Sequence, residues 1–393
     1  MLRPHRPLAA LLPALVVCTA FAAPFLPASD TQVLERLPGR ASDPRAQALR
    51  ALRLAWRQQP GDVVRAVRLA ERYFDEVATE GDPRYIGYAQ AALAPWWDLP
   101  APPAAVRVLR AKLLQFDHRF TEALVDLDAV LIANPAHGDA WAWRAAIHLV
   151  RADYTQARRS CEQLASLAPP LIGVACAAQV DAATGRTETA AAALRNALAS
   201  APGADPAQRL WALTRLGETE ERRGAYPAAE AAFRQALALD VSDVYLLAAY
   251  ADFLLDRNRP AEVLALLKDR SRADVLLLRL ALAAQAAGTP EREALARSLG
   301  ERLDAAALRG DTTHRKEASR YRLALRGQPE QALALARENF AEQREPADAR
   351  ILLEAALAAR QPAAAAPALA WMAASGIQSV ALQGLADRLK ALP

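Results

Sequence analysis

The chain has 393 residues, of which 53% are hydrophobic and only 6% aromatic, so its apolar content comes mostly from alanine and leucine. This composition favours packed helices over β-sheets, and a length beyond about 250–300 residues favours an array of units over one globular core. Its 48 basic and 44 acidic residues are scattered along the chain, which argues against nucleic-acid binding.

The first residues are typical of a secretory signal. Two arginines precede an apolar run, and a small-x-small pattern ends at Ala22, so we expect a signal peptide over residues 1–22. Two alternatives stay open: residues 8–26 could remain as a membrane anchor, and Cys18 could carry a lipid. All three place the rest of the chain outside the cytoplasm, most simply in the periplasm of a Gram-negative bacterium.

Residues 23–103 are expected to form an N-terminal helical segment. Amphipathic helices are predicted over 43–56 and 62–78, each beginning at an aspartate that serves as its N-cap. The stretch 81–103 is rich in proline, tyrosine and tryptophan, which predicts a loop packed over the first repeat. A loop that grips a ligand is the alternative.

Between residues 104 and 270 a small residue recurs at intervals of 34, 33, 39 and 34 residues. The positions are Ala123, Ala157, Ala190, Ala229 and Val263. Stacked helix–turn–helix units produce such a period, because small residues let the two helices of a unit approach each other. In the first three units a proline follows twelve residues later, where it would end the second helix.

The unit at 210–243 carries Leu216-Gly217, Tyr226, Ala229 and Phe233 at the spacing of the tetratricopeptide repeat family, which it resembles. The resemblance extends over about five units, and Ala332 and Ala365, which lie 33 residues apart, suggest that degenerate repeats continue over 271–393. It implies an all-α, right-handed superhelical solenoid of antiparallel helix pairs with about twenty helices. Beyond the core we expect helices over 272–287, 290–308, 312–325, 329–341, 347–359 and 363–374.

The family resemblance also implies that the first helices of the units line a concave groove for a protein or peptide partner. By register, that groove would present Asp139, Trp143, Gln179, Trp211, Thr214, Glu218, Glu221, Tyr245, Ala248 and Asp252. Trp211 and Tyr245 occupy equivalent positions in adjacent units, as do Glu218 and Asp252. With Trp143, they predict a surface for a basic, amphipathic segment. The alternative is ordinary packing residues beside a solvated face. Replacing Glu218 and Asp252 by lysine is expected to leave stability nearly unchanged, because exposed charge changes cost little.

Cys161 and Cys176 lie on consecutive predicted helices, at equal distances from the turn between them. Residues placed in this way on a tight hairpin lie at the same height, so a disulfide is expected in an oxidising compartment. Two free cysteines in the core are the alternative.

The sequence shows no motif for catalysis, for a cofactor or for a metal. Its five histidines have no ligand spacing, and C-x-x-C, H-E-x-x-H, G-x-S-x-G and glycine-rich phosphate loops are absent. We therefore expect no enzyme activity, no cofactor, no small-molecule substrate and no nucleic-acid partner. The predicted function is a non-catalytic protein-binding scaffold of the bacterial envelope, with a periplasmic chaperone or assembly factor for client chains as the alternative.

Overall fold

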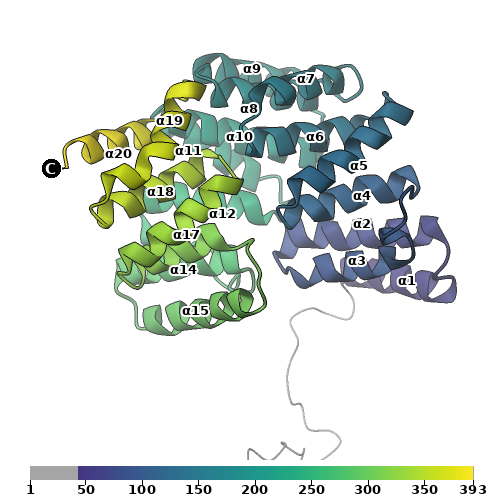
Figure 1. The fold of residues 1–393 in the computed structure, drawn as a ribbon, viewed down its shortest axis with the longest axis horizontal. Coiled ribbons are helices and arrows are strands. Elements are labelled where there is room, and N and C mark those ends of the chain that lie inside the picture. Colours follow the sequence, from purple (N-terminus) through teal and green to yellow (C-terminus); the bar gives the residue numbers. More distant parts are fainter. Residues whose placement is uncertain (1–42, 393) are drawn as a thin grey trace, which may run out of the picture. The chain divides into compact units, whose positions relative to one another are not determined.

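In the computed structural model, which describes residues 43–392, antiparallel helices follow one another through short turns (Figure 1). The first eleven are α1 (Pro44–Gln58), α2 (Val63–Glu80), α3 (Arg84–Trp97), α4 (Ala104–Phe116), α5 (Phe120–Ala133), α6 (Gly138–Val150), α7 (Tyr154–Ala165), α8 (Pro170–Ala183), α9 (Thr187–Ser200), α10 (Pro206–Arg222) and α11 (Tyr226–Leu237).

The C-terminal half continues the same alternation. Its elements are α12 (Val244–Asp256), α13 (Pro260–Leu266), α14 (Asp274–Ala287), α15 (Arg292–Leu308), α16 (Arg315–Ala324), α17 (Pro329–Glu342), α18 (Pro346–Ala358), the 3-10 turn η1 (Pro362–Ala365), α19 (Ala366–Ser375) and α20 (Val380–Lys390). The described residues contain no strand, so the prediction of an all-α chain with about twenty helices is confirmed.

The recurring small residues lie where the two helices of a unit meet. All five, from Ala123 to Val263, are fully buried, as are Ala332 and Ala365 in the weaker repeats. Gly217 shows how close the approach is, since a Cβ atom there would lie 2.7 Å from the ring of Phe233 on the partner helix. The period therefore records a packing requirement.

The turn inside each of these units also repeats. His118, Ala152, Gly185, Gly224 and Asn258 have φ values of 58°, 59°, 79°, 77° and 55°, all in the left-handed region. They are spaced 34, 33, 39 and 34 residues apart, the same intervals as the small residues. Glycine adopts this conformation without strain, but only two of the five turns have it.

The first helices of successive units contact one another and form an inner layer. The contacts run from α2 to α4 and onward through α6, α8, α10, α12, α14 and α16 to α18. The second helix of each unit packs outside this layer, in the arrangement of a right-handed superhelical solenoid. From Leu49 onward, these helices form one unit.

Two sequence predictions in the helical part were wrong. The stretch 81–103, expected to be a loop, contains α3, because Ile86, Ala89 and Leu93 recur at helical spacing and are buried. Pro95 lies in the last turn of α3, two residues before the helix ends. Helix α20 was missing from the predicted set, and its N-cap Ser379 accepts a hydrogen bond from the backbone N–H of Leu382.

None of the helices between residues 43 and 392 is long and apolar enough to cross a bilayer. The predicted leader, including Cys18 and the cleavage site after Ala22, lies outside the described residues. Both predicted N-caps are confirmed: Asp43 accepts a hydrogen bond from the backbone N–H of Arg45 (2.9 Å), and Asp62 accepts from those of Val64 and Arg65.

The C-terminal helices contact turns of units far earlier in the chain, along a line that we call the seam. The backbone N–H of Arg344 donates to the carbonyl of Val150 (2.8 Å), and the indole Nε1 of Trp371 donates to the hydroxyl of Tyr154 (3.0 Å). Further along, the Thr187 hydroxyl donates to the side-chain oxygen of Gln378 (2.5 Å). The seam therefore joins α17 to α20 with the turns after α6 and α8.

Candidate protein-binding surfaces

Tyr245 and Glu218, two of the residues predicted to bind a partner, lie together on the inner layer. The Tyr245 hydroxyl donates to Glu218 Oε1 (2.5 Å) and accepts from Arg215 Nη1 (2.8 Å). The Arg215 guanidinium also lies 4.3 Å from the centre of the tyrosine ring. Tyr245 is held in place by these contacts and is still 49% exposed, so it offers a fixed aromatic surface.

Asp252 forms a separate cluster. Its two carboxylate oxygens accept from Arg279 and Arg320, each at 2.6 Å. Burial would raise the pKa of Asp252, but these two guanidinium groups outweigh it and hold the pKa well below its usual range. Only 22% of the Glu218 side chain and 27% of the Asp252 side chain are exposed. Both acids are therefore half-buried and ion-paired within the chain, rather than free charges on a solvated face.

Further ion pairs join helices across the inner layer. Arg350 on α18 binds Asp256 on α12 (2.5 Å), and Lys316 on α16 lies 3.6 Å from Asp348 on α18. Burial raises the pKa of Glu221 on α10 to about 8, with further contributions from the negative charges of Asp256 and Glu218. At pH 7 the Glu221 carboxyl is therefore largely protonated and adds little charge to the inner layer.

Of the other residues predicted to line the concave groove, Asp139 is exposed and pairs with Lys112 (2.7 Å), Gln179 is half-buried, and the remaining four pack within the fold. Trp211 is half-buried against the cores of its neighbouring units. Trp143 lies edge-on to Phe74, with 5.6 Å between ring centres, and beneath the ammonium group of Lys112. Thr214 and Ala248 are buried. The structure thus brings together Glu218 and Tyr245, whereas Asp252, Trp211 and Trp143 each have contacts of their own.

A second surface, which the sequence did not predict, lies at the seam between α17 and α19. It is a hollow of about 970 Å³ that we call the seam groove. Phe340 and Trp371 form its floor, edge to face with 6.0 Å between ring centres, and both are almost fully buried. The lining residues are Ala152, Tyr154, Ala334, Arg337, Glu338, Phe340, Ala341, Arg344, Leu352, Pro367, Ala370, Trp371, Ala374 and Ser375.

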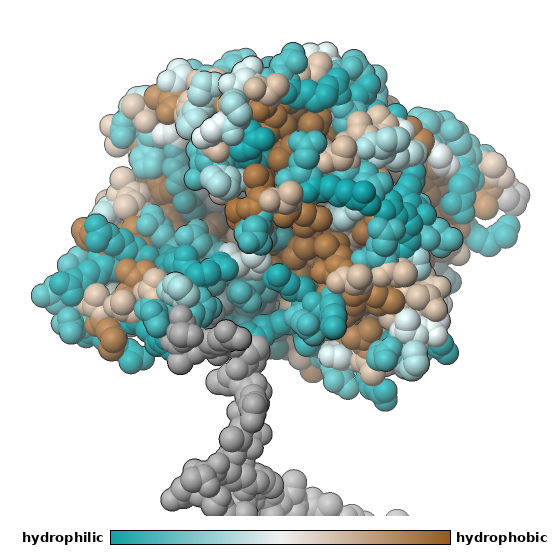
Figure 2. Space-filling model, turned by 180° about the vertical axis from the view of Figure 1, so that it is seen from behind, coloured by the Kyte–Doolittle hydropathy of each residue, from teal (hydrophilic) through white to brown (hydrophobic). Residues whose placement is uncertain are grey.

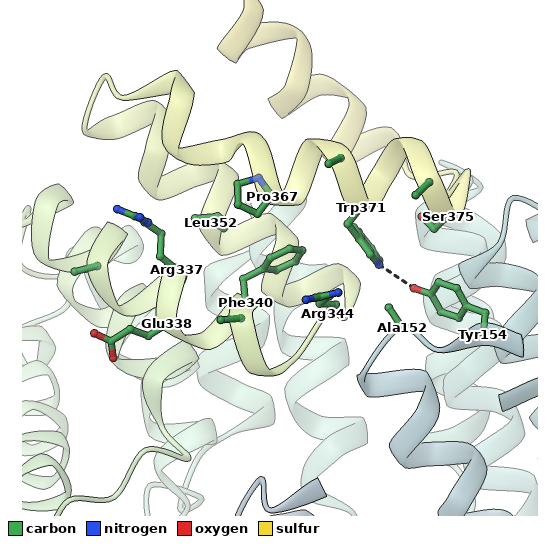
Figure 3. Close-up of a pocket in the computed structure, with 14 residues that line it drawn as sticks. Ala152, Tyr154, Arg337, Glu338, Phe340, Arg344, Leu352, Pro367, Trp371 and Ser375 are labelled. Carbon is green, nitrogen blue, oxygen red and sulfur yellow. Dashed lines mark hydrogen bonds between the residues drawn. The ribbon is translucent and has the colours of Figure 1, made fainter. Parts of the chain in front are cut away.

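The seam groove extends along both helices. Figure 3 shows Arg337 and Glu338 at one end, Phe340 and Trp371 in the middle, and Tyr154 and Ser375 at the other end. The alanines on α17 and α19 that line it are exposed, so small side chains border the open part of the groove above its aromatic floor. A smaller hollow of about 250 Å³ adjoins it and shares Ala341 and Arg344.

The charges around the two hollows are unbalanced. Arg337, Arg344 and Arg151 form no ion pair with any described residue. Glu338 and Glu342, in contrast, both bind Arg315, at 3.2 and 2.7 Å. Burial lowers the pKa of His118 in the smaller hollow, so that imidazole is neutral at pH 7.

The repeat pattern does not predict the seam groove, because the walls of the groove come from degenerate repeats and a distant turn. One signal was available, since the residues after 271 contain only three aromatic side chains, and Phe340 and Trp371 are two of them. An alanine-rich helix that carries a single large aromatic residue places that residue where packing or binding needs it.

The disulfide that the sequence predicts is present in the structure. Cys161 on α7 and Cys176 on α8 form a disulfide with their Cα atoms 5.5 Å apart, and both side chains are buried. The bridge ties the second helix of one unit to the first helix of the next.

Among residues 43–392 no group of three histidine, cysteine, aspartate or glutamate side chains is arranged to hold a metal ion.

The helices form an inner layer of first helices and an outer layer of second helices, and the units repeat every 33–39 residues. The fold is that of a tetratricopeptide-like solenoid.

No protein-family model matches the chain, and no curated protein matches it. Among solved structures, it is similar to a tetratricopeptide repeat protein from Parabacteroides merdae, with 14% identity, a TM-score of 0.41, and coverage of 65% of this chain and 90% of that one. It is also similar to Cut9–Hcn1 of the APC/C, with 11% identity, a TM-score of 0.48, and coverage of 84% and 63%. A third is PilW, a type IV pilus biogenesis factor, with 16% identity, a TM-score of 0.31, and coverage of 72% and 97%. These similarities concern the fold.

Proposed function

We propose that this protein is a non-catalytic scaffold that binds another protein in the bacterial envelope. The observation that carries the proposal is the seam groove, in which small side chains on two helices leave a hollow above the buried rings of Phe340 and Trp371. Such a shape suits the helix-in-groove mode of recognition, in which a partner helix inserts the side chains of one face. The half-exposed Tyr245 on the inner layer is a second candidate place for a partner to bind, as the repeat register predicts.

The disulfide supports the envelope location. Disulfides persist in oxidising compartments and are rare in the cytosol, so the bond between Cys161 and Cys176 favours an exported chain. This agrees with the predicted signal peptide over residues 1–22.

A periplasmic chaperone is the second candidate function. Figure 2 favours it, since apolar residues form a band between polar regions on the face behind that of Figure 1. A chaperone would bind many clients along such a band, whereas a scaffold would bind one partner at fixed stoichiometry.

Site-specific photo-crosslinking in intact cells separates the two. A photoreactive phenylalanine analogue at Ala341, an exposed residue of the seam groove, should join the protein to one partner. The same analogue at Ala307, an exposed alanine on α15, is the matched control and should give no product. A ladder of many products from both positions would favour the chaperone. Absence of any product from Ala341 and from Tyr245 would refute the scaffold.

A further inference from the structure

We propose that the seam groove binds an acidic, amphipathic helical segment of a partner protein. This inference rests on the proposed scaffold function and names the chemistry of its partner. The shape of the groove, the charges on its rim and the rigidity of its walls each support it.

The shape fits a helix. On α17 the lining alanines Ala334 and Ala341 are seven residues apart, which spans about 10 Å at 1.5 Å per residue. On α19 the lining residues run from Pro367 to Ser375, over a similar length. An open trench of two helical turns matches the i, i+3, i+4 and i+7 side chains of an amphipathic helix. The alanine walls leave room for those side chains to reach the Phe340 and Trp371 rings.

The charges select an acidic partner. Three guanidinium groups, those of Arg151, Arg337 and Arg344, line the two hollows, against the carboxylates of Glu338 and Glu342. Both carboxylates already share Arg315, so a basic partner finds no free acid to bind. An acidic partner instead meets three arginines that form no ion pair with any described residue. Unpaired charges of one sign reject like-charged partners as well as attracting opposite ones.

The groove is held in shape before any partner arrives. The backbone of Arg344 is hydrogen-bonded to Val150, which fixes the end of α17 to the turn after α6. At the other side, Trp371 is hydrogen-bonded to Tyr154 at the start of α7. A preformed site loses little conformational entropy on binding, which favours a specific partner over a succession of clients.

Fluorescence anisotropy with two designed peptides tests the proposal. The acidic probe is a labelled 16-residue helix with leucine on one face and glutamate on the flanks, and the basic probe has lysine in place of every glutamate. The acidic probe should bind the full protein at least about tenfold more tightly than the basic probe, and its affinity should fall as salt is raised. Equal affinities for the two probes, or tighter binding of the basic one, would overturn the proposal.

Charge reversal tests whether the acidic probe binds in the seam groove. The double variant Arg337→Glu, Arg344→Glu should bind the acidic probe about tenfold or more weakly than the wild type does, and it should bind the basic probe more tightly. The control is Arg297→Glu, Arg388→Glu, two exposed arginines on α15 and α20 that form no ion pair with a described residue, and it should bind like the wild type. Identical loss in both variants would overturn the proposal, because it would reflect net charge alone. The helical signal verifies folding, and the single variants Arg337→Gln and Arg344→Gln provide milder versions of the same test.

The outcomes also distinguish this inference from the scaffold function. Crosslinking of one partner at Ala341, combined with no preference for the acidic probe, would keep the scaffold and refute the acidic partner. Blocking the groove at another exposed lining alanine, by Ala370→Trp, should abolish probe binding and partner crosslinking from position 341 together. Probe binding that survives this substitution would remove the seam groove as the site.

Discussion

Two glycine-to-alanine substitutions test whether close helix packing sets the repeat. Gly217 lies inside α10, and a Cβ atom there would lie 2.7 Å from the ring of Phe233, which is fully buried and has no room to move. Gly384 lies inside α20 and is exposed, and a Cβ atom added there would meet nothing within 4 Å. Alanine is favoured over glycine in a helix by about 0.5–1 kcal/mol, so Gly384→Ala should stabilise the protein by that amount. Overpacking costs about 1–3 kcal/mol, so Gly217→Ala should destabilise the protein by about 0.5–2 kcal/mol net.

Urea unfolding followed by circular dichroism measures both changes. The midpoint should rise for Gly384→Ala and fall for Gly217→Ala, with the slope of the transition unchanged. Adding Phe233→Leu to Gly217→Ala should cost less than adding it to the wild type, because the smaller side chain relieves the clash. Stabilisation by Gly217→Ala, or strict additivity with Phe233→Leu, would refute the assignment of this glycine to close helix approach.

Four further outcomes follow from the contacts described. Replacing Cys161 and Cys176 by alanine should lower the unfolding free energy by up to about 3 kcal/mol, the value for a 15-residue loop, and a reductant alone should do the same to the wild type. The pKa of Glu221 is higher in the folded protein (about 8) than in the unfolded chain (4.5), so its contribution to stability is full below pH 4.5 and is lost as the pH rises through 8. Because glutamine does not titrate, the unfolding free energy of Glu221→Gln should rise by about 2–4 kcal/mol relative to that of the wild type as the pH is raised from 5 to 9. Urea midpoints measure this difference. Asp252 has a lowered pKa, so Asp252→Asn should cost about 1–3 kcal/mol at pH 7, a loss that disappears when the wild-type carboxyl is protonated in strong acid. The intact mass of protein recovered from the periplasm should correspond to a chain without residues 1–22, and a full-length mass would refute cleavage.

The repeat could be predicted from sequence because its packing requirement is local. Ala123, Ala157, Ala190 and Ala229 are the positions where two neighbouring helices touch, and only small residues fit there. The same logic located Cys161 and Cys176, which are close because they flank one turn. Contacts within a unit or between adjacent units leave a period that a single sequence displays.

Two local features, helix α3 and the turn at Ala152, escaped prediction for opposite reasons. Helix α3 was hidden by its composition, since Pro95 and the tryptophans beside it suggested a loop although Ile86 and Leu93 had helical spacing. The turn at Ala152 was hidden because an alanine there gives no sign of a left-handed conformation, which costs roughly 1–2 kcal/mol outside glycine. Hydrogen bonds from neighbouring turns and the seam fix that backbone despite the cost.

The candidate site could not be predicted because it depends on how far the superhelix turns. The register correctly placed Glu218 beside Tyr245, which are one unit apart, but it contained nothing about Arg320, which is 68 residues from Asp252 and neutralises it. Trp371 and Tyr154 are 217 residues apart and meet only because the C-terminal units return to the earlier turns. The pitch that brings them together sums small rotations over many units, and no single unit determines it. Charges that look exposed in one repeat are therefore paired across several, and the unpaired arginines remain at the seam, where the array of repeats meets itself.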